Sequence, residues 1–266
     1  MGHESGKNGG VYTSSLLIED CEDEWTNDNL TSSVEDTADY KVGAASVKAV
    51  NPGTRGENKL LCHEFGLTLP LTDYDAMYLW LKDSVGVTLN ELQMLLDDAN
   101  DCLSPTENLQ VRALTAGAWT QVFLPFADPD DLGSIVSVGL FQVPDLAARN
   151  TWMDDIRALK EIDGIKSWTL DYTNEALNTT DFGNSGVSAF IPGITAWIGT
   201  FEGYKEGIPL SIGSEVYLVL GETSTGSQCW IGKAIITGAV PSTDYDGIVS
   251  YSYTFQGTGA LEEPST

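Results

Sequence analysis

Residues 250–255 read Ser-Tyr-Ser-Tyr-Thr-Phe, a strict alternation of hydroxyl-bearing and aromatic side chains. Successive side chains of a β-strand point to opposite faces, so Tyr251, Tyr253 and Phe255 share one face and the hydroxyls share the other. This alternation is typical of a half-buried strand in an antiparallel sheet. We expect the aromatic face of this strand to pack in a core and not to serve as a binding surface.

Similar short runs recur along the whole chain. They are rich in β-branched and aromatic residues and are bounded by Gly, Asn, Asp or Pro, which predicts strands separated by turns. Signals for helices are scarce, since only Leu71–Asp75 and Val240–Tyr245 could hold a turn or two. The sequence therefore predicts an all-β protein with two sandwich or barrel units. The expected strands are Ala44–Val50, Ala76–Lys82, Glu91–Leu96, Thr120–Pro125, Ser134–Val143, Thr151–Ala158, Gly164–Tyr172, Thr195–Tyr204, Glu215–Leu220, Trp230–Ile236 and Gly247–Gln256.

The composition is that of a globular protein with an unusual charge. Of 266 residues, 42% are hydrophobic and 20% are charged, which is enough apolar material for one or two cores. The 39 acidic and 13 basic residues give a formal net charge of −26. Such a surface repels phosphates, so a protein that grips DNA or RNA is excluded as a class. Residues 17–158 hold 25 acidic and 8 basic residues, and the strand pattern changes near Ala158–Asp163.

Cysteine and histidine usage argues against metal and nucleophile chemistry. Cys21, Cys62, Cys102 and Cys229 are far apart in the sequence and form no C-x-x-C pair, which disfavours zinc. The polar, Gly-rich start of the chain has no apolar segment typical of a signal peptide, and no run approaches the roughly 20 apolar residues of a membrane span. We therefore expect reduced, partly buried thiols, although two disulfides are the alternative. No nucleophile–base pair surrounds either histidine, and we expect no catalytic residues.

Five segments between Leu17 and Ala158 occur in an order that resembles a known module. They read LIEDCEDEW, DTADYKVGAASVKAV, LTDYDAMYLWLK, AWTQVFLPF and TWMDDIRAL. Together they resemble the galactose-binding-like jelly rolls of carbohydrate-binding modules. The resemblance implies a β-sandwich jelly-roll domain over residues 17–159. Within it, Gly43 precedes a strand and is expected to take a φ that a side chain would forbid.

The same resemblance implies two sites. Pairing of the first and last strands would bring Glu19 and Glu22 near Asp154, and close carboxylates repel unless they are protonated or bridged by a cation. In the resembled family the cation is a structural calcium, which takes oxygen ligands; the alternative is solvated surface acids. Glycan binding would need an exposed aromatic platform, for which Trp25 is the candidate. Trp152 is also available, whereas Trp80 and Trp119 lie inside strand patterns and are expected in the core.

The second half of the chain resembles the tail tube (major tail) proteins of long-tailed bacteriophages. The matching text runs GIKSWTLDY, then TTDFG, IPG and WIGTFEGY, and closes with YSYTFQGTGAL. This family shares its fold with type VI secretion tubes and head–tail completion proteins. The resemblance implies subunits that join into rings of six around a lumen and then stack. The matching residues are Trp168, Asp171, Tyr172, Thr180, Phe182, Gly183, Pro192, Gly193, Trp197, Gly199, Phe201, Gly203, Phe255, Gly257 and Gly259.

The family also begins with a short strand, which residues 6–12 (GKNGGVY) match. Here the whole jelly-roll block separates that strand from Gly164-Ile165-Lys166. We therefore expect a discontinuous tail tube domain formed by residues 1–16 and 160–266, with residues 17–159 inserted into its first hairpin. Residues 6–14 would then pair with residues 164–172. The alternative is a plain tandem in which residues 1–16 are a disordered tail.

A tube subunit needs surfaces for its neighbours and a lumen that does not hold DNA. The long polar segment Thr173–Gly193 fits a hairpin loop that docks on a neighbouring subunit, and a mobile loop without a partner is the alternative. Its expected contact residues are Thr180, Phe182, Gly183, Phe190 and Ile191. Carboxylates facing a lumen would repel DNA phosphates, although most of these acids could also lie on a solvated outer surface. The lumen candidates are Asp171, Glu175 and Asp181, followed by Glu202 and Glu206.

These expectations combine into one hypothesis about function. The protein is expected to be a structural virion protein, made in the host cytoplasm, whose partners are copies of itself and other tail proteins. DNA would pass without specific binding, no membrane insertion is expected, and the jelly roll would project outward and contact host-surface glycans. The alternatives are another virion station, such as a tail terminator, tail tip or capsid decoration, or a secreted carbohydrate-binding protein.

Overall fold

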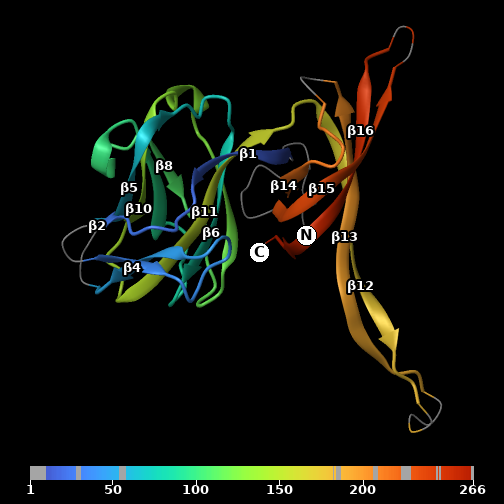
Figure 1. Cartoon of the computed structure of the whole chain (residues 1–266), viewed down its shortest axis with the longest axis horizontal. Helices are drawn as coiled ribbons and strands as arrows, with labels where there is room; N and C mark the ends of the chain where they lie inside the picture. The colour runs from blue at the N-terminus through green and yellow to red at the C-terminus, as the bar shows by residue number, and fades with distance from the viewer. Residues whose placement is uncertain are drawn as a thin grey trace, which may run out of the picture. The chain divides into compact units, whose positions relative to one another are not determined.

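The computed structural model describes residues 10–27, 31–53, 58–181, 183, 187–205, 209–222, 229–243, 245 and 247–264. The chain divides into two compact units. Unit 1 comprises Met1–Glu161, Gly221–Cys229 and Pro264–Thr266, and unit 2 comprises Ile162–Leu220 and Trp230–Glu263. Strands dominate both units (Figure 1), and the all-β prediction is confirmed.

Unit 1 contains two antiparallel sheets. The first is built around the long strand β11 (Arg149–Glu161), which pairs on one edge with β4 (Ser46–Asn51) and β1 (Val11–Glu19) and on the other with β6 (Ala76–Asp83). Next to β4 lies β3 (Ser32–Asp36), and next to β6 lies β9 (Thr120–Pro125). The second sheet has the order β2-β5-β10-β7-β8. Its strands are β2 (Thr26–Asn27), β5 (Asn58–Leu69), β10 (Ile135–Gln142), β7 (Leu92–Asp97) and β8 (Glu107–Gln110), with short 3-10 turns at η2 (Asn100–Cys102) and η3 (Pro129–Asp131).

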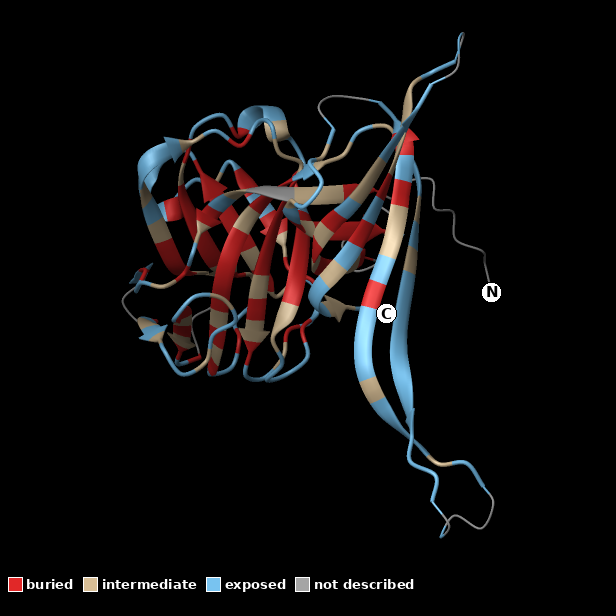
Figure 2. Cartoon of the chain, turned by 45° about the vertical axis from the view of Figure 1, so that its right-hand side comes forward, coloured by how far each residue is buried: buried red, intermediate tan, exposed pale blue. Residues whose placement is uncertain are grey.

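The core of unit 1 lies between these two sheets (Figure 2). Strand β4 shows the pattern that places it there, because Val47 and Ala49 are fully buried while Lys48 and Val50 are only partly buried. One hydrophobic cluster joins side chains of both sheets, so the unit is a β-sandwich. Cluster members include Val47, Leu79, Val122 and Met153 from the first sheet and Leu60, Met94, Val138 and Leu140 from the second.

The first strand differs from the expectation. Residues 6–14 were expected to pair with residues 164–172, but Tyr12, Thr13 and Ser14 pair with Glu161, Lys160 and Leu159 of β11. That predicted pairing is wrong for the described residues. The physical reason is continuity, since β1 runs without a break through residues 16 and 17, and its residue Ile18 belongs to the core of unit 1. The residues before it therefore also pair with β11, across register shifts between Ser14 and Leu16 and between Leu17 and Glu19.

Unit 2 contains an antiparallel sheet of order β12-β13-β16-β15-β14. The strands are β12 (Ile165–Asn178), β13 (Phe190–Tyr204), β14 (Glu215–Gly221), β15 (Cys229–Ser242) and β16 (Ser250–Glu262). All eleven strands expected from the sequence correspond to strands in the two units. The expected turn of helix at Val240–Tyr245 is wrong, because β15 continues through Ser242 and pairs there with Ser250.

The alternation at residues 250–255 has the predicted consequence. Tyr253 and Phe255 are buried, and the ring of Phe201 from β13 stacks on both at centroid distances of 5.0 and 6.1 Å. Two glycines make room for this aromatic layer. A Cβ on Gly257 would lie 2.1 Å from the indole of Trp197, and one on Gly199 would lie 2.5 Å from the ring of Phe255. The aromatic and glycine positions of this segment are thus parts of one packing arrangement.

Candidate functional site

The hairpin β12–β13 extends beyond the other strands of its sheet (Figure 1). Strand β16 pairs with β13 only from Ile198 to Tyr204. Beyond that point the described residues of the hairpin pair only with each other, from Thr173↔Ala196 to Asn178↔Phe190. We call this two-stranded segment, residues 173–178 and 190–196, the arm. Every arm residue except Gly193 is exposed (Figure 2).

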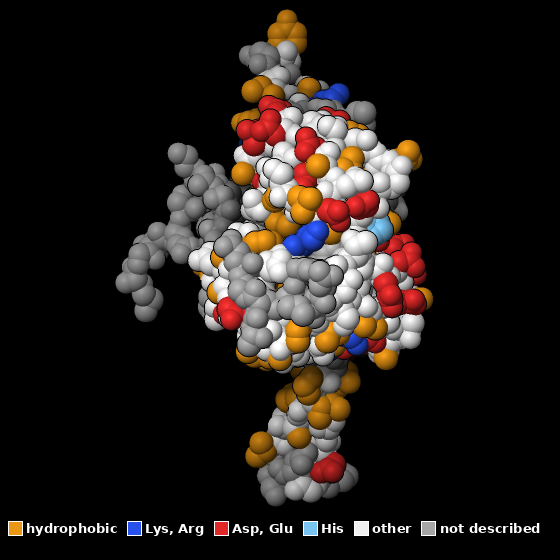
Figure 3. All heavy atoms as spheres, turned by 90° about the vertical axis from the view of Figure 1, so that its left-hand side faces the viewer, with side chains coloured by type: hydrophobic (Ala, Val, Ile, Leu, Met, Phe, Trp, Pro, Cys, Tyr) orange, Lys and Arg blue, Asp and Glu red, His pale blue; other side chains and the backbone are white. Residues whose placement is uncertain are grey.

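The arm carries apolar side chains that no layer covers. The exposed fractions are 58% for Phe190, 51% for Ile191, 76% for Ile194 and 42% for Leu177. Hydrophobic side chains gather along the projecting hairpin in the space-filling view (Figure 3). A two-stranded ribbon without a packed second layer is marginal in water, and an unpaired strand edge with exposed apolar residues favours association. The arm therefore has the physical character of a surface that another chain covers.

The sheet of unit 2 has one apolar and one polar face. Opposite the aromatic layer, Thr169 and Thr200 join their hydroxyls across β12 and β13 at 2.9 Å, and the Ser167 hydroxyl lies 3.3 Å from the Glu202 carboxylate. Asp171, Thr254 and Gln256 are exposed beside a hollow of about 440 Å³ that Thr169 and Thr200 also line. This open face combines hydroxyls, an amide and the carboxylates of Asp171 and Glu202 with the exposed side chain of Ile198.

No family model matches the chain. No curated protein matches it either. Among solved structures, the chain is similar to a chain of the tail of an empty GTA particle with C6 symmetry, at a TM-score of 0.35 and 15% identity, covering 40% of this chain and 87% of that chain. It is also similar to a chain of the virion of a native gene transfer agent particle, at a TM-score of 0.34 and 15% identity. That match covers 39% of this chain and 87% of that chain. Similarity at this level assigns neither a family nor a function.

The structure places the predicted contact and lumen residues in different surroundings. Thr180, Gly183, Phe190 and Ile191 are exposed at the far end of the hairpin, where the Thr180 hydroxyl accepts a hydrogen bond from the Ala189 amide at 2.9 Å. Glu175 and Asp181 are exposed on the arm and in the turn, respectively, whereas Asp171 lies beside the hollow of the open face. Phe182 and Glu206 lie outside the described residues. Sequence reasoning missed Leu177 and Ile194, because no periodic pattern marks this part of the hairpin.

The predicted calcium ligands lie around one loop of unit 1. Asp154 is fully buried, its Oδ2 accepts hydrogen bonds from the amides of Lys41 and Val42, and its Oδ1 has no hydrogen-bond partner among the described residues. Glu22 accepts the amide hydrogen of Ala44 at 2.8 Å, so both carboxylates reach the same loop. Gly43, in this loop, has φ +70°, as the sequence predicted.

Glu19 faces a different partner. Its Oε2 lies 3.1 Å from Nε2 of His63, and the described residues contain no group of three or more Asp, Glu, His or Cys side chains arranged to hold a metal ion. Burial raises the pKa of Glu19 to about 7 and that of Asp154 to about 6, because both carboxylates lose hydration. The unpartnered Oδ1 of Asp154 is the one observation here that favours a cation, since calcium takes oxygen ligands. Glu22 reaches the same loop, whereas Glu19 is directed toward His63.

Trp25 cannot be a glycan platform. It is only 3% exposed, belongs to the core of unit 1, and packs against His63 at a centroid distance of 5.6 Å. The prediction failed because the acidic residues before Trp25 suggested an exposed loop, whereas the chain there folds back onto β5 through the hydrogen bond from Thr26 to the carbonyl of Cys62. Trp80 and Trp119, expected in the core, are instead half-buried.

A row of tryptophan and lysine side chains crosses the first sheet of unit 1. Trp152 pairs across the strands with Lys48 on one side and Lys82 on the other, and their ammonium groups lie 5.6 and 4.8 Å from its ring centroid. The indole N–H of Trp152 donates to Asp36 at 2.9 Å, and Lys48 donates to the same carboxylate at 2.7 Å. Hydrogen bonds from Lys48 and Trp152 lower the pKa of Asp36 to about 2. We call these four residues, with Trp80, Trp119 and Asp39, the tryptophan face.

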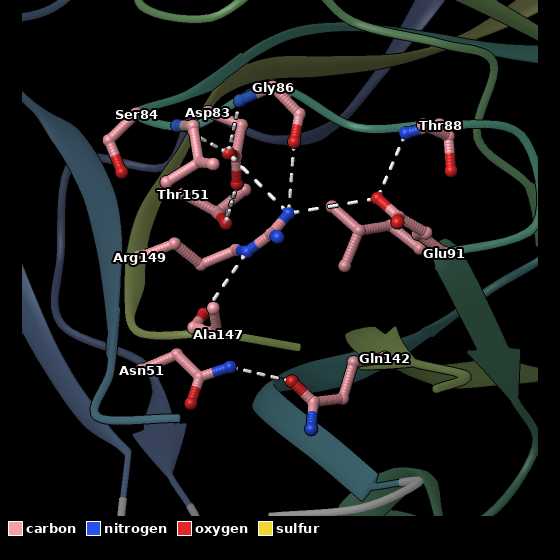
Figure 4. Close-up of polar contacts among 12 residues, drawn as sticks. Asn51, Asp83, Ser84, Gly86, Thr88, Glu91, Gln142, Ala147, Arg149 and Thr151 are labelled. Atoms are coloured by element: carbon pink, nitrogen blue, oxygen red, sulfur yellow. Dashed lines mark hydrogen bonds and ion pairs between the residues drawn. The ribbon is translucent and has the colours of Figure 1, made fainter. Parts of the chain in front are cut away.

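A buried polar network at one end of the sandwich has a structural role (Figure 4). The guanidinium of Arg149 donates to the carbonyl of Gly86 at 3.0 Å and lies 3.7 Å from the Asp83 carboxylate and 3.8 Å from Glu91. Asp83 is fully buried and also accepts hydrogen bonds from Thr151 and from two backbone amides. Because these groups satisfy one another, the network leaves no open position for a ligand.

No helix among the described residues is long and apolar enough to cross a membrane.

Proposed function

We propose that this protein is a structural subunit of a phage-like tail, which joins copies of itself into rings of six that stack around a channel. The arm is the observation that carries this proposal, because it exposes apolar side chains on a ribbon that needs a partner for stability. A second copy is the expected partner, since the sequence resembles tail tube proteins over the segment that forms the arm and its sheet. Other tail proteins would then bind at the ends of the stack.

We propose that the open face of unit 2 lines the channel. Its hydroxyls and carboxylates would stay hydrated, and the charges of Asp171 and Glu202 would repel DNA phosphates. Replacing both acids by lysine should give assemblies that retain duplex DNA at low salt and release it at high salt. The matched control replaces Glu24 and Asp73 of unit 1 by lysine, because these acids are also exposed. Equal DNA retention by both double variants would contradict the assignment of this face.

Sedimentation velocity of the purified full chain tests the assembly proposal. A tube subunit should sediment as hexamers or larger multiples that grow with concentration, because each added ring creates new stacking contacts. Monomers that persist at all accessible concentrations would count against self-assembly. The discontinuous tail tube domain of residues 1–16 and 160–266 is a separate hypothesis, because residues 12–14 pair with β11 of unit 1 and not with residues 164–172. It is wrong if a fragment of residues 160–266 assembles like the full chain.

A structural calcium in unit 1 is a further part of the proposal. Asp154, through its unpartnered Oδ1, and Glu22 would hold the ion, and the ion would neutralise a carboxylate that burial otherwise penalises. Added calcium should raise the melting temperature of the sandwich at pH 8, and a chelator should reverse the rise. Asp154→Asn should lose this response. A melting temperature that calcium does not change would exclude the site.

We also propose that the tryptophan face contacts host-surface glycans. Three half-buried indoles on one sheet face, accompanied by paired lysines and carboxylates, offer flat apolar surface and hydrogen-bonding groups together. A glycan array with the full chain, compared with Trp152→Ala, tests this role. Binding that survives the substitution would place the glycan elsewhere.

A further inference from the structure

Two cysteine side chains from distant parts of unit 1 meet on its second sheet. Cys62 lies on β5 and Cys102 ends the short turn η2, and their sulfur atoms are 2.9 Å apart. Both side chains are buried, at 0% and 4% exposure. Both cysteines are free thiols, so this contact is a hydrogen bond. The separation exceeds a disulfide bond by only about 0.9 Å, so small movements would bring the sulfurs to bonding distance.

The neighbouring strand β10 leaves space for the sulfur of Cys102. Gly139 on β10 lies opposite Cys62 in the β5–β10 register. A Cβ at this position would come within 2.9 Å of the sulfur of Cys102 and 3.0 Å of the carbonyl oxygen of Leu61. Any side chain at residue 139 would therefore push Cys102 away from Cys62. The glycine is required for the pairing of the two thiols.

The turn that carries Cys102 is held in an unfavourable backbone conformation. Asp101 and Cys102 have φ values of 68° and 46°, which residues other than glycine rarely adopt. Asp97 fixes the turn by accepting the amide hydrogens of Ala99 and Ser104, both at 3.1 Å. Ser137 donates to the carbonyl of Ala99 at 2.7 Å, and the thiol of Cys102 lies 3.3 Å from its hydroxyl. These hydrogen bonds offset the strain and keep the sulfur of Cys102 beside Cys62.

The two thiols differ in their electrostatic surroundings. The hydrogen bond between the two sulfurs lowers the pKa of Cys102, and Ser137 and the charge of Lys59 act in the same direction. The same hydrogen bond, together with burial, raises the pKa of Cys62. Cys102 is also the more accessible thiol, at 4% against 0% exposure for Cys62, so we assign it the attack on the oxidant. It also lines a surface hollow of about 490 Å³, together with Lys59 and Phe141, through which a small reagent can approach.

We propose that Cys62 and Cys102 form a redox site that reacts with a peroxide and closes to a disulfide. The Cys102 thiolate attacks one oxygen of hydrogen peroxide, the O–O bond breaks, and hydroxide leaves, giving a sulfenic acid on Cys102. The Cys62 sulfur then attacks the Cys102 sulfur and gives up its proton, and the sulfenic oxygen leaves as water. In sum, two thiols and one peroxide give one disulfide and two waters. The oxidant must be small, because the Cys102 side chain is only 4% exposed and a larger reagent could not reach its sulfur.

The disulfide would link β5 to η2 and close a loop of forty residues, which constrains the unfolded chain and stabilises unit 1. The two cysteines would thus stay reduced inside a cell, and in an oxidising medium they would form the disulfide that stabilises unit 1. This inference stands apart from the proposed tail function, because it depends only on contacts within unit 1.

Mass spectrometry of the full chain tests the proposal. The reduced protein is treated with hydrogen peroxide, unfolded, and alkylated with N-ethylmaleimide. Of the four cysteines, we expect two to escape alkylation, and peptide mapping should find Cys62 joined to Cys102. Dithiothreitol should restore four alkylation sites, and the oxidised protein should melt at a higher temperature. Four alkylated cysteines after treatment, or a disulfide between other cysteines, would overturn the proposal.

Single variants separate the two steps. In Cys62→Ser the reaction should stop at the sulfenic acid of Cys102, which dimedone traps as a stable adduct. Cys229→Ser, the matched control, removes a buried thiol elsewhere and should still form the disulfide. Since Cys62→Ser could disturb folding, the wild-type measurement decides the matter independently. In the wild-type protein, dimedone labelling of Cys62 in preference to Cys102 would contradict the assigned order of attack.

Discussion

Replacing Phe190, Ile191 and Ile194 by threonine removes most of the apolar surface of the arm and leaves its sheet intact. All three side chains are at least half exposed, so the substitutions take nothing from the aromatic layer of unit 2. Threonine is β-branched, as strands favour, and the aromatic layer is untouched, so unit 2 itself should stay folded. The variant therefore tests whether the arm is covered by another subunit, separately from whether unit 2 folds.

The expected loss follows from the exposed fractions. At 58%, 51% and 76% exposure, the three side chains together leave uncovered the equivalent of nearly two complete residues. Full burial of one such side chain is worth about 1.5–3 kcal/mol, so complete coverage of one arm would contribute about 3–6 kcal/mol. Removing this contribution should weaken association between subunits by a factor of about 10² to 10⁴ per arm.

Sedimentation velocity over a concentration series measures this effect. The matched control replaces Leu67, Val85 and Leu89 of unit 1 by threonine, because their exposures of 82%, 55% and 63% are similar and none lies on the arm. The control should assemble like the wild type, while the arm variant should need at least a hundredfold higher concentration. Circular dichroism should show that both variants remain folded β-proteins. An arm variant that assembles at the wild-type concentration would refute the reasoning.

Three further outcomes follow from the packing and electrostatics. Gly257→Ala should destabilise unit 2 by about 1–3 kcal/mol, because the new Cβ collides with the indole of Trp197. In the control Gly259→Ala the new Cβ meets no atom within 4 Å, so this variant should have the melting temperature of the wild type. Equal melting temperatures of the two variants would contradict the packing argument. Arg149→Met should cost unit 1 about 3 kcal/mol or more and lower its melting temperature by about 10 °C, because it leaves a buried carboxylate without its cation; an unchanged melting temperature would show that the network adds no stability. The folded pKa of Glu19 is raised to about 7, so its protonated form is favoured in the native state and stability is lost as the pH rises through 7. Without calcium, the melting temperature should fall between pH 5 and pH 8, and Glu19→Gln should remove most of that fall; a variant with the same pH profile as the wild type would assign the effect to another group.

Much of the fold was predictable because its strands follow simple patterns. The alternation at residues 250–255 gave both the strand and its buried face, and turn residues bounded the other ten predicted strands. Strand β5 was missed because charged and polar residues interrupt its apolar run, and its partners lie far away in the sequence. The length of the hairpin was also underestimated, since its distal half has no buried face and so no periodicity that marks a core.

The candidate sites were less predictable than the fold. Trp25 was placed on the surface because acidic residues precede it, but burial depends on how the following chain folds back, which local sequence does not determine. The tryptophan face arises from register, because Lys48, Trp152 and Lys82 become neighbours only when β4, β11 and β6 pair. The thiol pair depends likewise on Gly139, whose significance appears only across the sheet. Pairing between strands that are distant in the sequence thus forms these sites, and local sequence patterns do not reveal that pairing.

Electron microscopy of the purified full chain in negative stain tests the central claim most directly. If the chain builds a tail, the micrographs should show rings with sixfold symmetry and a central channel, which stack into tubes as concentration increases. The arm variant, imaged at the same concentration, should show isolated particles. A field of uniform single subunits for the wild-type protein, at concentrations where sedimentation finds no larger species, would contradict the proposal that this chain builds a tail.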